Sequence, residues 1–273
     1  MNTISRRHFL KLVGAAAAAV PSLGWAQTTA RFRVRLLVPA YIYPAPGAWN
    51  AYINAHNPAK GVEVTLIANP SNGTFSTVDS NYAAAIKGAA AKGLPVLGYI
   101  HTQYGQRTLA SVEQDVANWL KLYPQITGFF VDEQAATATQ LPYYASLFAY
   151  IRSKKPGAFI VGNPGRTCDV RYLVDRNVTQ ANVVVLWENT DQYGSFSGFN
   201  VPPAFQTLSP ERVAAIIYNC TPLKYITGPT GARAKQIGYI FVTDGSGGNP
   251  YGNVPSYWTT GEVPGIQSTN VGF

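Results

Sequence analysis

Three carboxylates follow apolar runs of the sequence. Asp132 and Glu133 come directly after Gly128–Val131, with no Lys or Arg beside them, and Glu188 ends the run Val183–Trp187. A carboxylate at the end of a buried strand loses hydration free energy unless it is hydrogen-bonded or functional. Two carboxyl groups on either side of a glycosidic bond can hydrolyse it. We therefore predict that Asp132, Glu133 and Glu188 are catalytic.

Each acid also has a structural explanation. One member of the Asp132–Glu133 pair could cap the helix that follows, and Glu188 could be a rim residue paired with an Arg. Side chains alternate along a strand, so Asp132 and Glu133 can face one site together only if the strand has already ended. A single strand is expected between those that carry Asp132 and Glu188, which would let the two side chains converge.

Aromatic and amide residues follow other apolar runs, where rings could stack on sugar faces and amides could read hydroxyl or acetamido groups. The residues predicted to bind substrate on this basis are Tyr41, Tyr43, Asn69, His101, Tyr104, Asn163, Asn189 and Trp258. Asn69 and Asn163 precede Pro, and each taken alone is more typical of a turn, just as a lone His is more often structural. The sequence has no phosphate loop, no Gly-x-Ser-x-Gly and no metal-ligand spacing, so no cofactor is predicted.

Eight apolar runs of strand length must position these residues. They are Val34–Val38, Val62–Ile67, Val96–Ile100, Ile126–Val131, Phe159–Val161, Val183–Trp187, Ala214–Tyr218 and Tyr239–Val242. Most are continuous and rich in Val and Ile, which is typical of parallel strands buried on both faces. The segments between them that read as helix are Tyr82–Lys92, Ser111–Leu122, Tyr143–Lys154 and Pro222–Lys235. Ser111–Gln114 is similar to a capping box, and Gly93 is expected to end the helix before it.

Eight strands alternating with helices over residues 27–273 predict an α/β fold made of a single (β/α)8 TIM-type barrel. A doubly wound open sheet is the alternative, but no Gly-x-Gly-x-x-Gly turn follows the first strand. In a barrel, the residues just past the carboxyl ends of the strands form the active face, which is where the acids and amides fall. The Gly-rich segment from Gly245 to Phe273 is expected to be a loop that packs on the barrel or frays.

The first 26 residues are typical of an export signal. Ser5–Lys11 contains Arg6-Arg7 followed by Phe-Leu-Lys, an apolar stretch then runs to Val20, and small residues at 24 and 26 suit cleavage after Ala26. Residues 1–26 are therefore predicted to be a twin-arginine signal peptide that directs a folded chain to its export machinery. The mature chain, 27–273, is expected to be soluble and periplasmic or secreted, since no later stretch has the ~18 apolar residues of a membrane span.

Composition excludes several classes of protein. With 47% hydrophobic and 12% charged residues among 273, the chain can bury a large core and is not disordered. Three of its eight excess positive charges lie in residues 1–26, which leaves +5, and the other Lys and Arg are scattered. A nucleic-acid partner is therefore not predicted. Cys168 and Cys220 are the only cysteines and could form a disulfide after export or remain two buried thiols.

Several segments together resemble the spherulin-4 family of (β/α)8 glycoside hydrolases. They are Val38–Pro44, Ile67–Gly73, Leu97–Gly105, Gly128–Glu133, Asn163–Gly165 and Gly238–Asp244, in order along nearly the whole mature chain. The resemblance implies endo-acting hydrolysis of galactosaminogalactan at α-1,4-linked N-acetylgalactosamine. Related bacterial enzymes act on galactosamine-rich biofilm polysaccharides. The partner implied is thus an amino-sugar polysaccharide.

The same resemblance implies roles for the acids. Asp132 would be the nucleophile or charge stabiliser, Glu188 the general acid/base, and Glu133 would support Asp132 or exchange roles with it. Retention of configuration is the expectation, and it requires carboxyl groups about 5 Å apart rather than the roughly 6.5–9.5 Å of inversion. The alternative function is a non-catalytic cell-surface or polysaccharide-binding protein on the same barrel, since fold does not fix activity.

Overall fold

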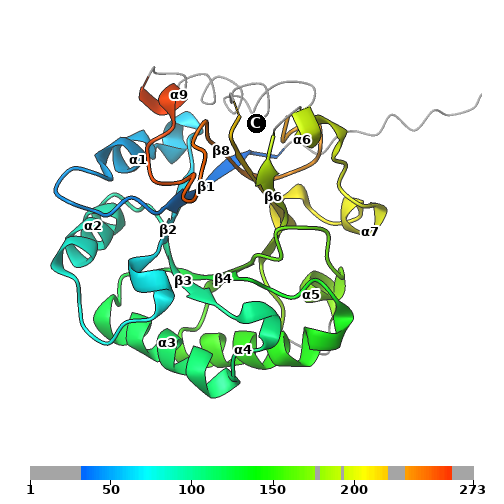
Figure 1. The fold of residues 1–273 in the computed structure, drawn as a ribbon, viewed down its shortest axis with the longest axis horizontal. Helices are drawn as coiled ribbons and strands as arrows, with labels where there is room; N and C mark the ends of the chain where they lie inside the picture. The colour runs from blue at the N-terminus through cyan, green and yellow to red at the C-terminus, as the bar shows by residue number, and fades with distance from the viewer. Residues whose placement is uncertain (1–31, 176–178, 192–193, 221–230, 260–273) are drawn as a thin grey trace, which may run out of the picture. The chain divides into compact units, whose positions relative to one another are not determined.

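The eight strands form a closed parallel barrel in sequence order (Figure 1). The computed structural model describes residues 32–175, 179–191, 194–220 and 231–259. The strands are β1 Arg35–Ala40, β2 Val64–Ala68, β3 Val96–His101, β4 Gly128–Asp132, β5 Phe159–Gly162, β6 Val183–Thr190, β7 Val213–Tyr218 and β8 Tyr239–Val242. Closure of the sheet between β1 and β8 confirms the predicted (β/α)8 barrel and excludes the doubly wound alternative. The predicted signal at 1–26 lies outside the described residues.

Each strand coincides with a predicted apolar run because its side chains are buried on both faces. All five residues of β2 and all four of β8 are buried. One face of each strand fills the barrel and the other packs under helices, so alternation with polar residues would leave polar groups without water. β1 to β5 continue one or two residues past their predicted runs, and β6 continues furthest, to Thr190, so that Glu188 lies within the strand.

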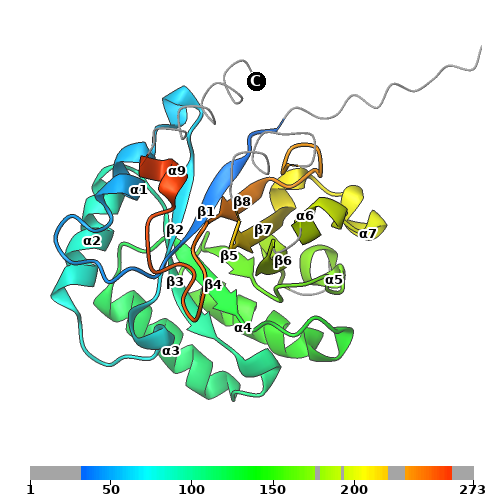
Figure 2. The same cartoon turned by 45° about the horizontal axis from the view of Figure 1, so that its top comes forward.

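Three long helices pack on the outside of the barrel along β2 to β5, and shorter helices lie beside the other strands (Figures 1 and 2). The long helices are α2 Ser80–Ala91, α3 Leu109–Leu122 and α4 Leu141–Lys154. The short ones are α1 Asn50–Ala55, α5 Arg171–Val174, α6 Ser195–Gly198, α7 Pro203–Gln206 and α9 Ser256–Thr259. The predicted helix Pro222–Lys235 falls mostly outside the described residues, and its described end, 231–235, is turn and bend. Within the ranges given above, no helix is long and apolar enough to cross a membrane.

The start of α3 differs from the prediction. Thr108 is the N-cap, and its side chain accepts a hydrogen bond from the Ser111 backbone N–H at 3.3 Å. Ser111 therefore lies inside the first turn, and the predicted capping box at Ser111–Gln114 is wrong, because a Thr three residues earlier supplies the cap. The end of α2 is as predicted, since Gly93 takes the left-handed φ of +71° just past it.

Gly98 of β3 lets α3 approach the barrel closely. A Cβ at Gly98 would lie 2.7 Å from the ring of Trp119, so any side chain there would displace that ring. Trp119 is fully buried, and its indole N–H donates to the Tyr99 carbonyl at 2.8 Å. The contact fixes the backbone of β3 directly behind Tyr99, whose side chain reaches the cleft described below.

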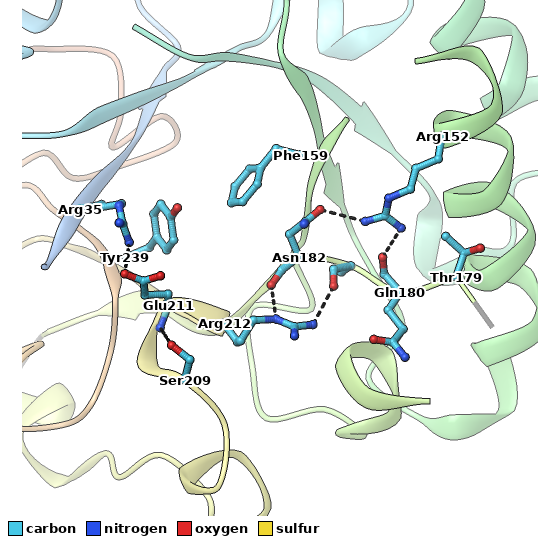
Figure 3. Close-up of a pocket in the computed structure, with 11 residues that line it drawn as sticks. Arg35, Arg152, Phe159, Thr179, Gln180, Asn182, Ser209, Glu211, Arg212 and Tyr239 are labelled. Carbon is cyan, nitrogen blue, oxygen red and sulfur yellow. Dashed lines mark hydrogen bonds and ion pairs between the residues drawn. The ribbon is translucent and has the colours of Figure 1, made fainter. Parts of the chain in front are cut away.

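The opposite, amino-terminal end of the barrel holds a pocket of about 570 Å³ that is rich in arginine (Figure 3). Arg212 donates to the carbonyls of Asn182, Leu173 and Ala181 at 2.6, 2.8 and 3.1 Å, and Arg152 donates to Gln180 and Asn182. These bonds tie the segment before β6 to α4 and β7. At this end of a barrel, such contacts serve stability rather than chemistry.

We expect the substitution Arg212→Met to lower the free energy of unfolding by about 3 kcal/mol, because three carbonyl groups lose a charged donor in a part-buried place. Urea denaturation would measure the change. Arg171→Met is the matched control, since Arg171 is exposed and pairs only locally with Asp169, and it should leave the midpoint unchanged. Equal midpoints for Arg212→Met and the parent would contradict the role given to these bonds.

The two cysteines are separate thiols. Cys168 and Cys220 are both buried and are not bonded to each other, and the Cys220 Sγ donates to Asp191 Oδ2 at 3.4 Å. Of the two alternatives open from the sequence, the structure has buried thiols and no disulfide between them. Burial raises the pKa of the Cys168 thiol to about 12, so it stays protonated and unreactive.

Candidate active site

A cleft of about 840 Å³ opens over the carboxyl ends of β3 to β8. Its lining contains all three predicted acids, together with tyrosines, amides and glycines from the loops after β3, β5 and β8 and from the ends of β6 and β7. The lining residues are Tyr104, Asp132, Glu133, Asn163, Pro164, Gly165, Arg166, Glu188, Asn189, Tyr218, Gly247, Gly248, Pro250 and Tyr251. This is the end of a TIM-type barrel at which active sites form.

The end of β4 brings two consecutive acids to one side. Asp132 is the last residue of the strand, and Glu133 leaves it with a left-handed φ of +51°. This conformation is costly for a residue with a side chain, and such strain persists mainly at functional sites. Because the strand has ended, alternation no longer applies, and Asp132 and Glu133 both line the cleft.

A β-bulge aims Glu188. Between Val185 and Trp187 the pairing of β6 with β7 shifts by one residue, so Leu186 has no partner of its own. The bulge displaces the alternation of faces for the residues that follow it, and bulges are frequent beside active sites for this reason. The Glu188 N–H also donates to the Gly165 carbonyl at 2.9 Å, which ties β6 to the loop after β5.

One amide joins the two strands' acids. Asn163, which directly follows β5, uses its Nδ2 to donate to Asp132 Oδ1 at 2.7 Å and to Glu188 Oε2 at 2.5 Å. Its Oδ1 accepts from the Gly165 N–H at 3.0 Å, which fixes which end of the amide is the donor. The two carboxylate oxygens share this nitrogen, so they can be no farther apart than the two distances end to end, about 5.2 Å.

Two tyrosines hold the far oxygens of the same carboxylates. Tyr99 OH donates to Asp132 Oδ2 at 2.6 Å, and Tyr251 OH donates to Glu188 Oε1 at 2.7 Å. Burial, together with the neighbouring carboxylates, raises the pKa of both phenols well above the ordinary value, so they remain donors at any working pH. Tyr41 packs edge-on against both rings, with centroids 5.9 and 5.5 Å away.

The two carboxyl groups have unlike surroundings. Burial raises the pKa of Asp132 and the charge of Glu133 adds to the rise, but three donors, from Tyr99, the Glu133 backbone and Asn163, oppose it. Burial also raises the pKa of Glu188, where the charge of Asp132 adds to the rise and only Tyr251 and Asn163 oppose it. Asp132 is therefore better suited to be the anion and Glu188 to carry the proton, which is the division that acid–base catalysis needs.

Glu133 faces a different partner. Its Oε2 accepts from the Gln103 backbone N–H at 3.0 Å, and its carbonyl accepts from the Tyr104 N–H at 2.7 Å. Both bonds hold the turn Gln103–Gly105, three successive residues with positive φ. The side chain of Glu133 thus supports a loop of the cleft rather than sharing the Asn163 amide.

The predicted sugar-contact residues separate into two groups. Tyr104, Asn163 and Asn189 line the cleft, although the Asn163 side chain is already used by the acids and Gly165, and Tyr41 packs against the cleft tyrosines. Tyr43, Asn69, His101 and Trp258 are not among the residues of its lining.

Each of these four residues has another structural setting. Tyr43 is bonded to Asp79 and Asn81 beside α2, and His101 Nδ1 lies 3.0 Å from the Asn72 carbonyl. Asn69 lies in the turn before Pro70, and its carbonyl accepts from Tyr82. The structure does not support a sugar contact for Trp258, because it is buried against Tyr52 and donates to the Ala51 carbonyl.

The residues that the sequence analysis missed are Tyr99, Gly165, Arg166, Tyr218 and Tyr251. Tyr99 lies inside an apolar run, and Tyr251 lies in the segment expected to be a plain loop. No local spacing marks a tyrosine that meets a glutamate 63 positions away. Among the described residues, no group of three or more His, Cys, Asp or Glu could hold a metal ion.

Comparison with known proteins fits this geometry. The family model of spherulation-specific family 4 matches residues 35–261. The chain belongs to this family. Spherulin-4 of Physarum polycephalum is 29% identical over 244 residues, which span 87% of this chain and 71% of that protein.

Two solved structures share the barrel fold of this chain. Aspergillus clavatus Sph3, crystallised in complex with GalNAc, has 25% identity and a TM-score of 0.71, over 86% of this chain and 98% of that one. An α-amylase from Geobacillus thermoleovorans complexed with acarbose has 10% identity and a TM-score of 0.51, over 87% and 78%. At that identity the α-amylase shows the fold alone.

We expect Asn163→Ala to raise the pKa of both Asp132 and Glu188. Each carboxylate loses a donor that favours its ionised form, and the loss of such a donor moves a carboxyl pKa upward. An NMR titration of the labelled carboxyl carbons would measure both. Asn189→Ala is the matched control, because Asn189 is exposed in the same cleft and its Oδ1 accepts from its neighbour Thr190. A rise at only one carboxyl would contradict the shared-donor arrangement.

Proposed function

We propose that this protein is an exported glycoside hydrolase that cuts within a polysaccharide of α-1,4-linked N-acetylgalactosamine or galactosamine, with retention of configuration. The single observation that carries the proposal is the Asn163 amide, which brings the Asp132 and Glu188 carboxyl groups to one point of the cleft. Membership of spherulation-specific family 4 supports it, as does the similarity to Sph3, which was crystallised with GalNAc.

Asp132 and Glu188 divide the reaction in this proposal. Glu188 gives its proton to the glycosidic oxygen while Asp132 attacks the anomeric carbon and forms a glycosyl ester. Glu188, now ionised, then takes a proton from water, and that water breaks the ester. The two oxygens that share the Asn163 Nδ2 lie at most about 5.2 Å apart, which supports the close carboxyl pair of a retaining enzyme over the wider pair of an inverting one.

The charges of the cleft suit an amino-sugar chain although the protein as a whole is basic. Asp132, Glu133 and Glu188 face the cleft, and Arg166 is the one Lys or Arg in its lining. The cleft therefore presents a local negative potential that tolerates an occasional free amine, while N-acetylated units avoid the overall repulsion. The predicted twin-arginine signal would place the enzyme where such polysaccharides occur.

The substitutions Asp132→Asn and Glu188→Gln should each lower the rate of reducing-end release from galactosaminogalactan by about a thousandfold or more. Asn removes the nucleophile, and Gln removes the transferable proton. Thr207→Ala, at an exposed Thr outside the cleft lining, should retain most of the activity. If the folded parent binds the polysaccharide without releasing reducing ends, the protein is a polysaccharide-binding module and not a hydrolase.

The stereochemistry of the first product tests the assignment of Asp132. Proton NMR of the early reaction should show the α-anomer at the new reducing end before mutarotation, because two inversions at one carbon restore its configuration. An initial β-anomer would mean direct attack by water and would contradict a nucleophilic Asp132.

A further inference from the structure

A second hollow of about 620 Å³ lies beside the cleft, between the loops that follow β4 and β5. It shares Tyr104, Pro164 and Arg166 with the cleft, so these residues form a wall between two adjoining hollows. Its other lining residues are Gln134, Ala135, Ala136, Thr137, Thr139, Gln140 and Thr167. The reaction assigned to the acids makes no use of this space.

Tyr104 lies on the boundary between the two hollows, and a strained turn of the backbone exposes its side chain. The side chain is 57% exposed, which is unusual for so large a ring. The turn that carries it has φ of +49°, +56° and +82° at Gln103, Tyr104 and Gly105. Glu133 holds the first two residues through their N–H groups, and the Gln140 side chain lies against Gly105, where a Cβ would be 3.1 Å away.

Backbone strain held by its surroundings and used to expose an aromatic ring is typical of a ligand-contact loop. Tyrosine presents a flat apolar face and a polar tip, which together suit the apolar face and the hydroxyl groups of a pyranose. A ring that borders both spaces can support a saccharide chain that passes from one into the other.

The lining of the hollow indicates the chemistry of its occupant. The lining residues include no Asp or Glu, unlike the cleft, and their charge is the single cation Arg166. Thr137, Thr139 and Thr167 are exposed and offer hydroxyl groups that can donate or accept. This surface suits a neutral, hydroxyl-rich ring and disfavours an ammonium group.

We infer that the second hollow is a further subsite for a neutral pyranose unit of the glycan, reached from the cleft over Tyr104. The inference rests on the proposed function for the identity of the glycan. Glu133 then acts as a positioning residue, because it holds the turn that presents Tyr104.

The test measures the binding of α-1,4-linked N-acetylgalactosamine oligosaccharides of increasing length by calorimetry in the Glu188→Gln background. We expect Kd to fall about tenfold at the length that first reaches the hollow. Thr139→Trp and Thr167→Trp, which fill the hollow, should abolish this gain and leave the affinity of shorter oligosaccharides unchanged. Thr207→Trp, at an exposed Thr outside both linings, is the matched control and should keep the gain.

Tyr104→Ala should lose the same gain, and Tyr104→Phe should keep it because the ring remains. The subsite would be overturned if the Thr139→Trp and Thr167→Trp variants bound oligosaccharides of every length more weakly, or if they bound all lengths as tightly as the parent. Hydrolysis by the parent separates the two proposals. A parent that shows the length-dependent gain without cleaving any oligosaccharide keeps the subsite and rejects the enzyme, and a parent that binds no length rejects both.

Discussion

The shared hydrogen bonds of Asn163 are the constraint on which the site depends. Two carboxylates at one point repel each other and lose hydration, and a donor common to both offsets part of that cost while fixing their separation. The amide comes from the strand between those of the two acids, so the order of neighbours in the barrel is a condition of the chemistry. Gly165 then sets the orientation of the amide through its N–H.

The surroundings of Asp132 and Glu188 come from two different sides of the barrel. β3 and β4 supply Asp132 and its donor Tyr99, and the close packing of Trp119 on Gly98 holds that side firmly. The side of Glu188 is built from less regular parts, a bulged strand and a loop rich in glycine. The more regular side thus carries the acid with more donors, and the less regular side carries the acid to which the proposed mechanism assigns the transferable proton.

Much of the fold follows from local sequence, because every barrel strand contains an apolar run and such runs are short and distinct. The acids at the strand ends could be predicted for the same reason, because Asp132 and Glu188 directly follow those runs. The bulge at Leu186 leaves no mark in the sequence, and neither does the double use of Asn163. Tyr251 belongs to a segment with the composition of an ordinary loop, and only the closed barrel brings it to Glu188.

Tyr251 follows the last strand of the barrel, and β8 closes the sheet by pairing with β1. A chain emerging from the ribosome therefore possesses both acids and their common amide long before it possesses the partner of Glu188. Folding of amino-terminal portions during synthesis can arrange half of the site at most. The finished centre appears together with the finished barrel, so a premature chain end before β8 removes the Tyr251 hydrogen bond to Glu188 as well as the closure.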